Sequence, residues 1–318
     1  MNKRYIAVDI GGTQIRAALC DAEGGIHARA ADATAPEEGR EAVQARIERA
    51  IGQVWPPEGG VAAMGVGAPG PLDPRTGVIL RCPNIPGWDG YPLRDVLHDR
   101  FQVPVVLGDD ANAAALAEQR FGAGRGRPHM IYLTISTGVG SGIIVNDRLL
   151  LGAGGLAAEV GCMVVDPNGP LCGCGNPGCL EALVSGPAIA RAARERVRAG
   201  EATCLLEMAG GDPRRITALT VSQAAQRGDP LAVEVLGRAG AYLGLGLVSL
   251  LHLFNPDIVV IGGSVSKAGE LLLGPAREVV RRRCLSEAYW RDTPIVLAEL
   301  GDDVGLLGAL CLAQQAGL

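Results

Sequence analysis

Short apolar runs separated by glycine-rich turns predict an α/β protein. Residues 4–10 (RYIAVDI) and 15–21 (IRAALCD) read as strands, and Gly11-Gly12-Thr13 between them reads as a turn, so a β-hairpin is expected here. A second hairpin is expected about 125 residues further on, from Met130 to Val145, where two apolar runs flank a turn at 137–142. The repetition predicts two duplicated lobes that face each other.

The rest of the chain predicts further strands and helices. Strands are expected at 26–31, 61–67, 103–107, 258–261 and 295–298, and helices at 41–54, 111–121, 187–199, 231–254 and 304–314. The helix 231–254 is apolar on nearly every face, so it is expected to be buried. Residues 69–92 are rich in proline and glycine and are expected to form a functional loop with short strands.

Domain boundaries are expected at structured crossings, because the sequence contains no low-complexity linker. A length of 318 residues favours two domains at roughly 150 residues each. The crossings are placed near Ala111 and near Leu300. We therefore expect a small α/β lobe of residues 1–110 plus 300–318 and a large α/β lobe of residues 111–299.

Charge and composition narrow the function classes. The chain has 29 basic and 34 acidic residues, a net charge of −5, and no long basic block. Nucleic-acid and membrane partners are therefore not expected. The first residues lack the pattern of a signal peptide, and no run approaches the ~20 apolar residues that span a bilayer. A cytoplasmic protein is expected.

Two glycine-rich turns are candidates for phosphate binding. Glycine lets backbone N–H groups close on phosphate oxygens, threonine hydroxyls add donors, and an aspartate at a strand end can hold magnesium through water. A simple hairpin turn is the alternative for each, but two turns in matched settings, followed by a third Gly-Gly turn after a later strand, favour nucleotide binding. The candidate residues are Asp9, Gly11, Gly12, Thr13, Thr137, Gly138, Gly140, Gly262 and Gly263.

Two adjacent carboxylates follow the strand 103–107. Asp109 and Asp110 open the predicted helix 111–121, so a carboxylate here can simply cap the helix. The catalytic alternative needs one carboxylate to take a proton from a hydroxyl during phosphoryl transfer. Asp110 is the candidate general base.

Four of the nine cysteines gather within eighteen positions, which indicates a metal site rather than disulfides. Glycine, asparagine and proline between the thiols let the chain fold back around one tetrahedral ion. Structural zinc is therefore expected at Cys162, Cys172, Cys174 and Cys179, with unpaired thiols as the alternative. Glu159 and Glu181 flank this segment, and each has a solvated surface charge as its simpler interpretation.

Taken together, these segments resemble the ROK family of sugar kinases and sugar-responsive repressors, and in particular its bacterial glucokinase branch. The resemblance spans nearly the whole chain. Its most specific part is residues 159–181 (EVGCMVVDPNGPLCGCGNPGCLE), which match the family signature except at one position. The residues 9–13, 83–88, 110–112 and 137–142 match other family segments.

The resemblance implies the two-lobed actin and hexokinase architecture, of ribonuclease-H-like topology, with a cleft between the lobes. It implies ATP with Mg²⁺ as phosphoryl donor, gripped by the two glycine-rich turns, with Gly262-Gly263 bordering the adenosine and structural Zn²⁺ in the cysteine segment. It implies a free hexose as substrate, glucose first, bound by Gly70, Asn84, Asp109, Asp110, Glu159 and Glu181. A homodimer or homotetramer is expected by the same likeness.

Two departures from the family pattern bear on the sugar. Family kinases usually carry histidine where this chain has Cys162, so the metal can be held while an N–H donor to the sugar is lost. They typically carry asparagine where this chain has Asp109. N-acetylmannosamine, mannose or fructose as substrate, or a non-catalytic sugar-binding protein, are therefore the alternatives. A repressor is not expected, because the first kinase-like strand begins at Arg4 and leaves no room for a helix-turn-helix domain.

Overall fold

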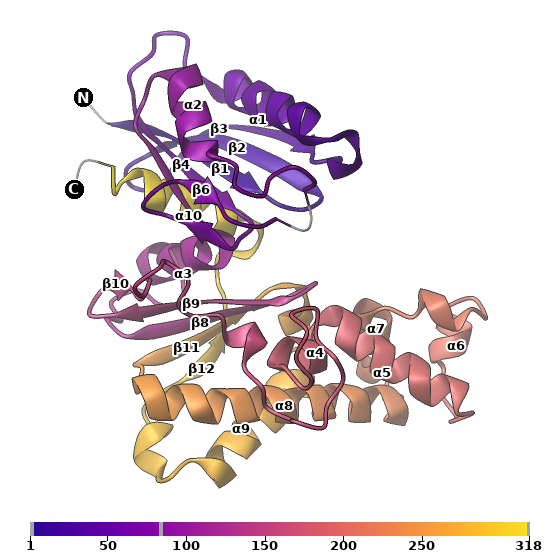
Figure 1. Ribbon diagram of the computed structural model, residues 1–318. Coiled ribbons are helices and arrows are strands. Elements are labelled where there is room, and N and C mark those ends of the chain that lie inside the picture. Colours follow the sequence, from indigo (N-terminus) through magenta and orange to yellow (C-terminus); the bar gives the residue numbers. More distant parts are fainter. Residues whose placement is uncertain (1–2, 83–84, 317–318) are drawn as a thin grey trace. The chain divides into compact units, whose positions relative to one another are not determined.

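The computed structural model describes residues 3–82 and 85–316 and divides the chain into two compact α/β units (Figure 1). Unit 1 contains the chain up to Gly126, Leu149–Ala158 and the chain from Glu299 onward. Unit 2 contains Arg127–Arg148 and Glu159–Ala298. The expected boundary near Ala111 thus differs from the observed crossing after Gly126, because α3 (Asp110–Phe121) packs on α10 (Val304–Ala313) inside unit 1.

Unit 1 is built on one five-stranded sheet. The strand order is β3 (Ile26–Ala33), β2 (Gln14–Asp21), β1 (Arg4–Ile10), β4 (Val61–Ala68) and β7 (Val105–Asp109). β1, β2 and β3 are antiparallel, whereas β1, β4 and β7 run parallel. A small ribbon of β5 (Leu72–Asp73) and β6 (Val78–Ile79) lies in the expected loop region.

Side chains of β1 alternate between two cores, as the period of a strand requires. Ile6 and Val8 join the core beneath α1 (Arg40–Val54) and α2 (Leu93–Phe101), and Tyr5 and Ala7 join the core beneath α10. In Figure 1, α1 and α2 cover one face of this sheet and α10 covers the other. α10 approaches closely because Gly65 of β4 has no Cβ, which would overlap the carbonyl of Ala309.

Unit 2 repeats this strand arrangement. Its sheet has the order β10 (Arg148–Leu149), β9 (Val139–Val145), β8 (Met130–Ile135), β11 (Ile258–Gly262) and β12 (Ile295–Leu297). β8 pairs with β9 as an antiparallel hairpin and with β11 in parallel, as β1 does with β2 and β4. The predicted duplication of the hairpin is therefore present in both sheets.

Helices of unit 2 centre on α8 (Pro230–Phe254), which packs on α9 (Glu270–Arg283) and on α4 (Leu180–Val184), α5 (Gly186–Arg198) and α7 (Ala218–Gln226). α6 (Leu205–Met208) contacts α7. Within the described part of the chain, α8 is the one helix long and apolar enough to cross a membrane by length and composition. Twelve of its residues are buried, as in a core helix of a folded domain.

Candidate active site and cysteine cluster

Parallel strands of unit 1 bring several candidate residues to one edge of the sheet. Asp9 is paired in register with Gly67, and Ala68 is paired with Asp109, at the carboxyl ends of β1, β4 and β7. Gly70 follows two residues beyond β4, and a Cβ there would lie 3.0 Å from Asp109 Oδ2. Ligands of open α/β sheets bind beyond the carboxyl ends of the strands, so this edge is the candidate site of unit 1.

Asp9 is buried and paired with an arginine. Arg16 Nε donates to Asp9 Oδ2 at 3.0 Å, Arg16 Nη2 contacts the same oxygen, and Nη1 donates to the backbone oxygen of Asp302 at 2.6 Å. Asp9 and Arg16 are direct partners in the β1–β2 register. The two contacts with Asp9 use Oδ2, so Oδ1 is the oxygen that could orient a water of a bound magnesium ion.

The first glycine-rich turn is held at its base and presents its tip to solvent. Gly11 N–H donates to Gln14 O at 2.9 Å, and the hydroxyl of Thr34 donates to Gly11 O at 2.6 Å. Gly12 and Thr13 are exposed. A Cβ at Gly12 would meet no atom within 4 Å, so the tip has the open space that an approaching phosphate needs.

Asp109 and Asp110 have different surroundings although they are neighbours in sequence. Asp109 is the N-cap of α3, and its Oδ1 accepts from the N–H groups of Ala111 at 3.0 Å and Asn112 at 3.2 Å. Burial raises the pKa of the Asp109 carboxyl, and the two backbone hydrogen bonds offset part of this effect. Asp110 is exposed in the first turn of the helix. The capping alternative thus applies to Asp109, and Asn84 lies outside the described residues.

The corresponding turn of unit 2 lies beside a second glycine pair. Ser136 N–H donates to Gly138 O at 2.9 Å and closes the turn, while Thr137 is exposed. The hydroxyls of Ser136 and Ser264 lie 3.1 Å apart, which places this turn next to the segment that follows Gly262 and Gly263. Gly263 has φ +84°, and a Cβ there would overlap Ile135. Glycine is required at this position for both reasons.

Both ends of the signature segment contact the start of β9. Glu181 Oε2 accepts from the N–H of Val139 at 3.0 Å, and a Cβ at Gly138 would lie 2.5 Å from the same oxygen. Glu159 is the exposed N-cap of the short 3-10 helix Val160–Cys162, in which Gly161 packs directly on the Val139 carbonyl. The two glutamates therefore flank a segment that packs on the unit 2 turn.

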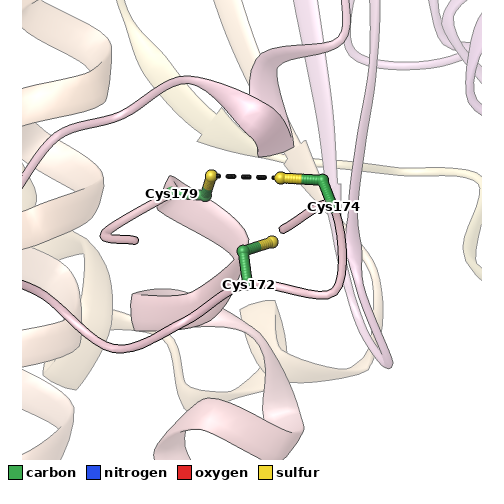
Figure 2. Close-up of side chains that lie close together, drawn as sticks. All are labelled: Cys172, Cys174 and Cys179. Carbon is green, nitrogen blue, oxygen red and sulfur yellow. Dashed lines mark hydrogen bonds between the residues drawn. The ribbon is translucent and has the colours of Figure 1, made fainter. Parts of the chain in front are cut away.

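Three of the four candidate metal ligands lie together (Figure 2). The sulfurs of Cys172, Cys174 and Cys179 lie within 4.8 Å of one another, and those of Cys174 and Cys179 are 3.4 Å apart. Tetrahedral zinc with bonds of about 2.3 Å holds its sulfurs about 3.8 Å apart, so this cluster has the right size and donor type for Zn²⁺. Gly175 N–H donates to Cys172 O at 2.9 Å. This turn folds the chain back, as the spacing of the cysteines predicts.

The predicted fourth ligand, Cys162, lies outside this group, because its sulfur is not within 4.8 Å of all three others. Its thiol contacts that of Cys174, and its carbonyl oxygen lies 3.4 Å from Cys179 Sγ. Burial raises the pKa of Cys162 and of Cys179 to about 12. Hydrogen bonds from the Asn176 backbone and from the neighbouring thiols lower that of Cys174 to about 7. Cys174 is thus the thiol most readily converted to the thiolate that zinc requires.

Arg16 and Ser264 are not among the site residues predicted from the sequence. A signal for Arg16 was available, because a hairpin with its turn at Gly11-Gly12-Thr13 places residue 16 directly opposite Asp9, and opposite charges in such a pair attract. Ser264 had a weaker signal, as the residue after the Gly262-Gly263 turn. Its contact with Ser136 joins residues 128 positions apart, which no local pattern reports.

Comparison with known proteins agrees with this arrangement. The family model described as "ROK family" matches residues 5–316. A glucokinase of Thermotoga maritima is 38% identical over 98% of both chains. The solved ROK glucokinase of Streptomyces griseus, in complex with glucose and AMPPNP, is 40% identical, covers 98% of this chain and 99% of its own, and has a TM-score of 0.85.

A ROK hexokinase from Thermus thermophilus is 37% identical over 98% of both chains, with a TM-score of 0.80. These matches confirm the predicted two-lobed, actin-like α/β fold. They cover the chain from the first hairpin to α10. On the strength of the family model and of these full-length similarities, this chain belongs to the ROK family.

Proposed function

We propose that this protein phosphorylates glucose with ATP and that Asp110 is the general base. The chain is an ATP-dependent hexose kinase, as its full-length similarity to ROK glucokinases and hexokinases indicates. Glucose as the preferred hexose and the role of Asp110 are the finer parts of the proposal. The observation that carries the second part is the different environment of two adjacent carboxylates, Asp109 and Asp110.

Asp110 suits the role of base better than Asp109. The Asp109 carboxylate is engaged in capping α3, where its Oδ1 already accepts two backbone N–H groups. Asp110 is exposed at the same sheet edge. In the proposed reaction it accepts the proton of the primary hydroxyl as the hydroxyl oxygen attacks the γ-phosphorus. The bond from this phosphorus to the β,γ-bridging oxygen breaks, and ADP leaves.

The glycine-rich turns are proposed to hold the phosphates. Backbone N–H groups around Gly11, Gly12 and Thr13 in unit 1, and around Thr137, Gly138 and Gly140 in unit 2, would donate to phosphate oxygens. Gly262 and Gly263 are assigned to the adenosine. Asp9 Oδ1 would orient a water of Mg²⁺, which when bound neutralises charge on the β- and γ-phosphates.

Sugar binding is assigned to Gly70, Asn84, Asp109 and Asp110 in unit 1 and to Glu159 and Glu181 in unit 2. Zinc, held by Cys162, Cys172, Cys174 and Cys179, would fix the segment that carries the two glutamates. The glucokinase similarity at 38–40% identity supports glucose. The Cys162 and Asp109 departures favour testing N-acetylmannosamine, mannose and fructose beside it, because an altered donor set can change sugar choice by one to two orders of magnitude.

Two further expectations remain predictions. Homodimer or homotetramer formation is proposed by likeness to the family. A cytoplasmic location is proposed by likeness to the related glucokinases.

Coupled ADP release across these sugars tests the proposal. We expect the highest kcat/KM with glucose and negligible ADP release without sugar. A higher kcat/KM with another hexose would replace glucose as substrate and leave the kinase reaction intact. Tight sugar binding without ADP release for any sugar would instead identify a non-catalytic sugar-binding protein.

A further inference from the structure

Glu118 is a fully buried side chain in the last turn of α3 and is not among the residues assigned above. Its relative exposure is 0%. Oε2 accepts from the N–H of Ala123 at 2.9 Å. Oε1 accepts from the N–H groups of Glu299 at 3.1 Å and Leu300 at 3.0 Å. One side chain therefore satisfies three backbone donors from two segments that are far apart in sequence, and buried polar groups need such partners.

Ala123 and the pair Glu299 and Leu300 lie in the two segments, called the connections below, where the chain passes between the two units. The chain passes from unit 1 to unit 2 after Gly126 and returns to unit 1 at Glu299. Ala123 lies just before the first of these crossings, and Glu299 and Leu300 lie at the second. The units are also linked at 148–149 and 158–159, so Glu118 holds two of four crossings at one point of unit 1.

The glycine that follows α3 makes room for this arrangement. A Cβ at Gly122 would overlap Glu118 Oε2 and lie 3.0 Å from Leu300 Cγ. An exposed ion pair between Arg125 and Glu299, at 3.7 Å, joins the same two connections at the surface, where such a pair contributes little.

The position of Glu118 links these connections to the reaction. Asp110 is on the same helix, eight residues earlier, or about 12 Å along the axis. The turn 137–140 follows the first connection in sequence, and Gly262-Gly263 precedes the second. Within unit 1, Glu118 therefore ties the helix that carries the proposed base to the backbone of both connections. Phosphoryl transfer is sensitive to misplacement of about 1 Å between reacting groups.

We propose that Glu118 is a positioning residue for the kinase reaction: it holds the two connections in place and sets turnover without touching either substrate. The inference rests on the proposed function for its kinetic consequence. Its structural part, the protection of three backbone N–H groups, is independent of activity.

Glu118→Gln is the sharpest variant, because it keeps the size of the side chain and replaces one acceptor oxygen by an NH₂ group that faces a donor. Glu299→Gln is the matched control, since it neutralises an exposed carboxylate on the same connection without removing an acceptor from the backbone N–H groups. Hydrogen exchange of peptides covering 122–126 and 298–301 measures how well the backbone N–H groups of the two connections are protected. Steady-state kinetics, normalised to the folded fraction, measure the effect of Glu118 on turnover.

For Glu118→Gln we expect faster exchange in both peptides, a roughly tenfold lower kcat and a KM for ATP within about twofold of wild type. Glu299→Gln should match wild type in both measurements.

Unchanged exchange in Glu118→Gln would overturn the structural part, and faster exchange with wild-type kcat would overturn the positioning role. If Glu118→Gln does not fold, Gly122→Ala displaces the same carboxylate and is judged by the same outcomes. A wild-type protein inactive on every sugar would refute the kinase assignment, and the exchange data would still decide whether Glu118 holds the connections.

Discussion

Glu181 accepts a hydrogen bond from the backbone N–H of Val139 at 3.0 Å, and its other carboxylate oxygen lies 3.8 Å from the sulfur of Cys172. One side chain thus connects the cysteine cluster with the glycine-rich turn of unit 2. Glu181 lies only two residues after Cys179, in the first turn of α4. A metal that fixes the cysteines would therefore also fix the carboxylate and, through it, the turn.

Removal of one ligand tests this connection. Cys174→Ser should lose most of the zinc, from about one ion per chain, because a hydroxyl is a much poorer zinc ligand than a thiolate. Loss of the support behind Glu181 should lower kcat/KM by roughly 10- to 100-fold. Metal analysis and the coupled assay measure the two effects. Cys284→Ser is the control, since Cys284 ends α9 outside the cluster. Full zinc content and wild-type kinetics in Cys174→Ser would refute the metal site.

The raised pKa of Asp109 predicts how the stability of the protein depends on pH. Its pKa is raised in the folded protein by burial, so its contribution to stability is fully present below its ordinary pKa of 3.8 and is lost as pH rises through the higher folded value. Asp109→Asn keeps a cap oxygen and removes this titration. The free energy of unfolding of the variant, relative to wild type, should therefore increase between acidic and neutral pH in urea titrations.

Asp229 is the matched control, because it caps α8 with the opposite sign. Burial raises its pKa, but hydrogen bonds from Ala232, Thr203 and Cys204 outweigh this effect and lower it overall. Its stabilisation is present above pH 3.8 and is lost as pH falls through the lower folded value. Asp229→Asn should cost stability at neutral pH and less in acid. The same pH trend in both variants would contradict the assignment.

The Asp9–Arg16 pair predicts a stability difference between two arginines. Arg16→Met leaves a buried carboxylate without its guanidinium and should lower the free energy of unfolding by about 1–3 kcal/mol. Arg29→Met removes a solvent-exposed pair with Asp303 and should cost about 0–1 kcal/mol. Denaturant unfolding of both variants provides the comparison. Equal losses would show that burial of Asp9 does not set the strength of its pairing.

Local patterns predicted much of the fold. Both hairpins follow from alternating apolar residues around glycine turns, and the cysteine cluster follows from its spacing. α9 was not predicted, because Gly274 and Pro275 interrupt its interior and its last turn is three arginines. α2 was missed because it is nine residues long and begins directly after Pro92.

Long-range contacts explain the rest of what the sequence did not reveal. Glu118 bonds residues 181 and 182 positions away, so nothing in its local sequence marks it as different from a helix surface glutamate. The boundary after Gly126 was missed for a similar reason. α3 packs on α10, nearly 200 residues later, and this contact assigns the helix to unit 1. Asp110 was the candidate base from the sequence alone, but the sequence could not show that Asp109 is the carboxylate that caps α3.

The central claim is that Asp110 takes the proton during transfer of phosphate from ATP to the 6-hydroxyl of glucose. Phosphorus NMR of the reaction with glucose tests it most directly, by following ATP, ADP and the sugar phosphate in wild type, Asp110→Asn and Asp109→Asn. We predict glucose 6-phosphate from wild type and from Asp109→Asn, and a rate lower by at least roughly 100-fold for Asp110→Asn with its fold intact. Near-normal formation of glucose 6-phosphate by Asp110→Asn would contradict the account.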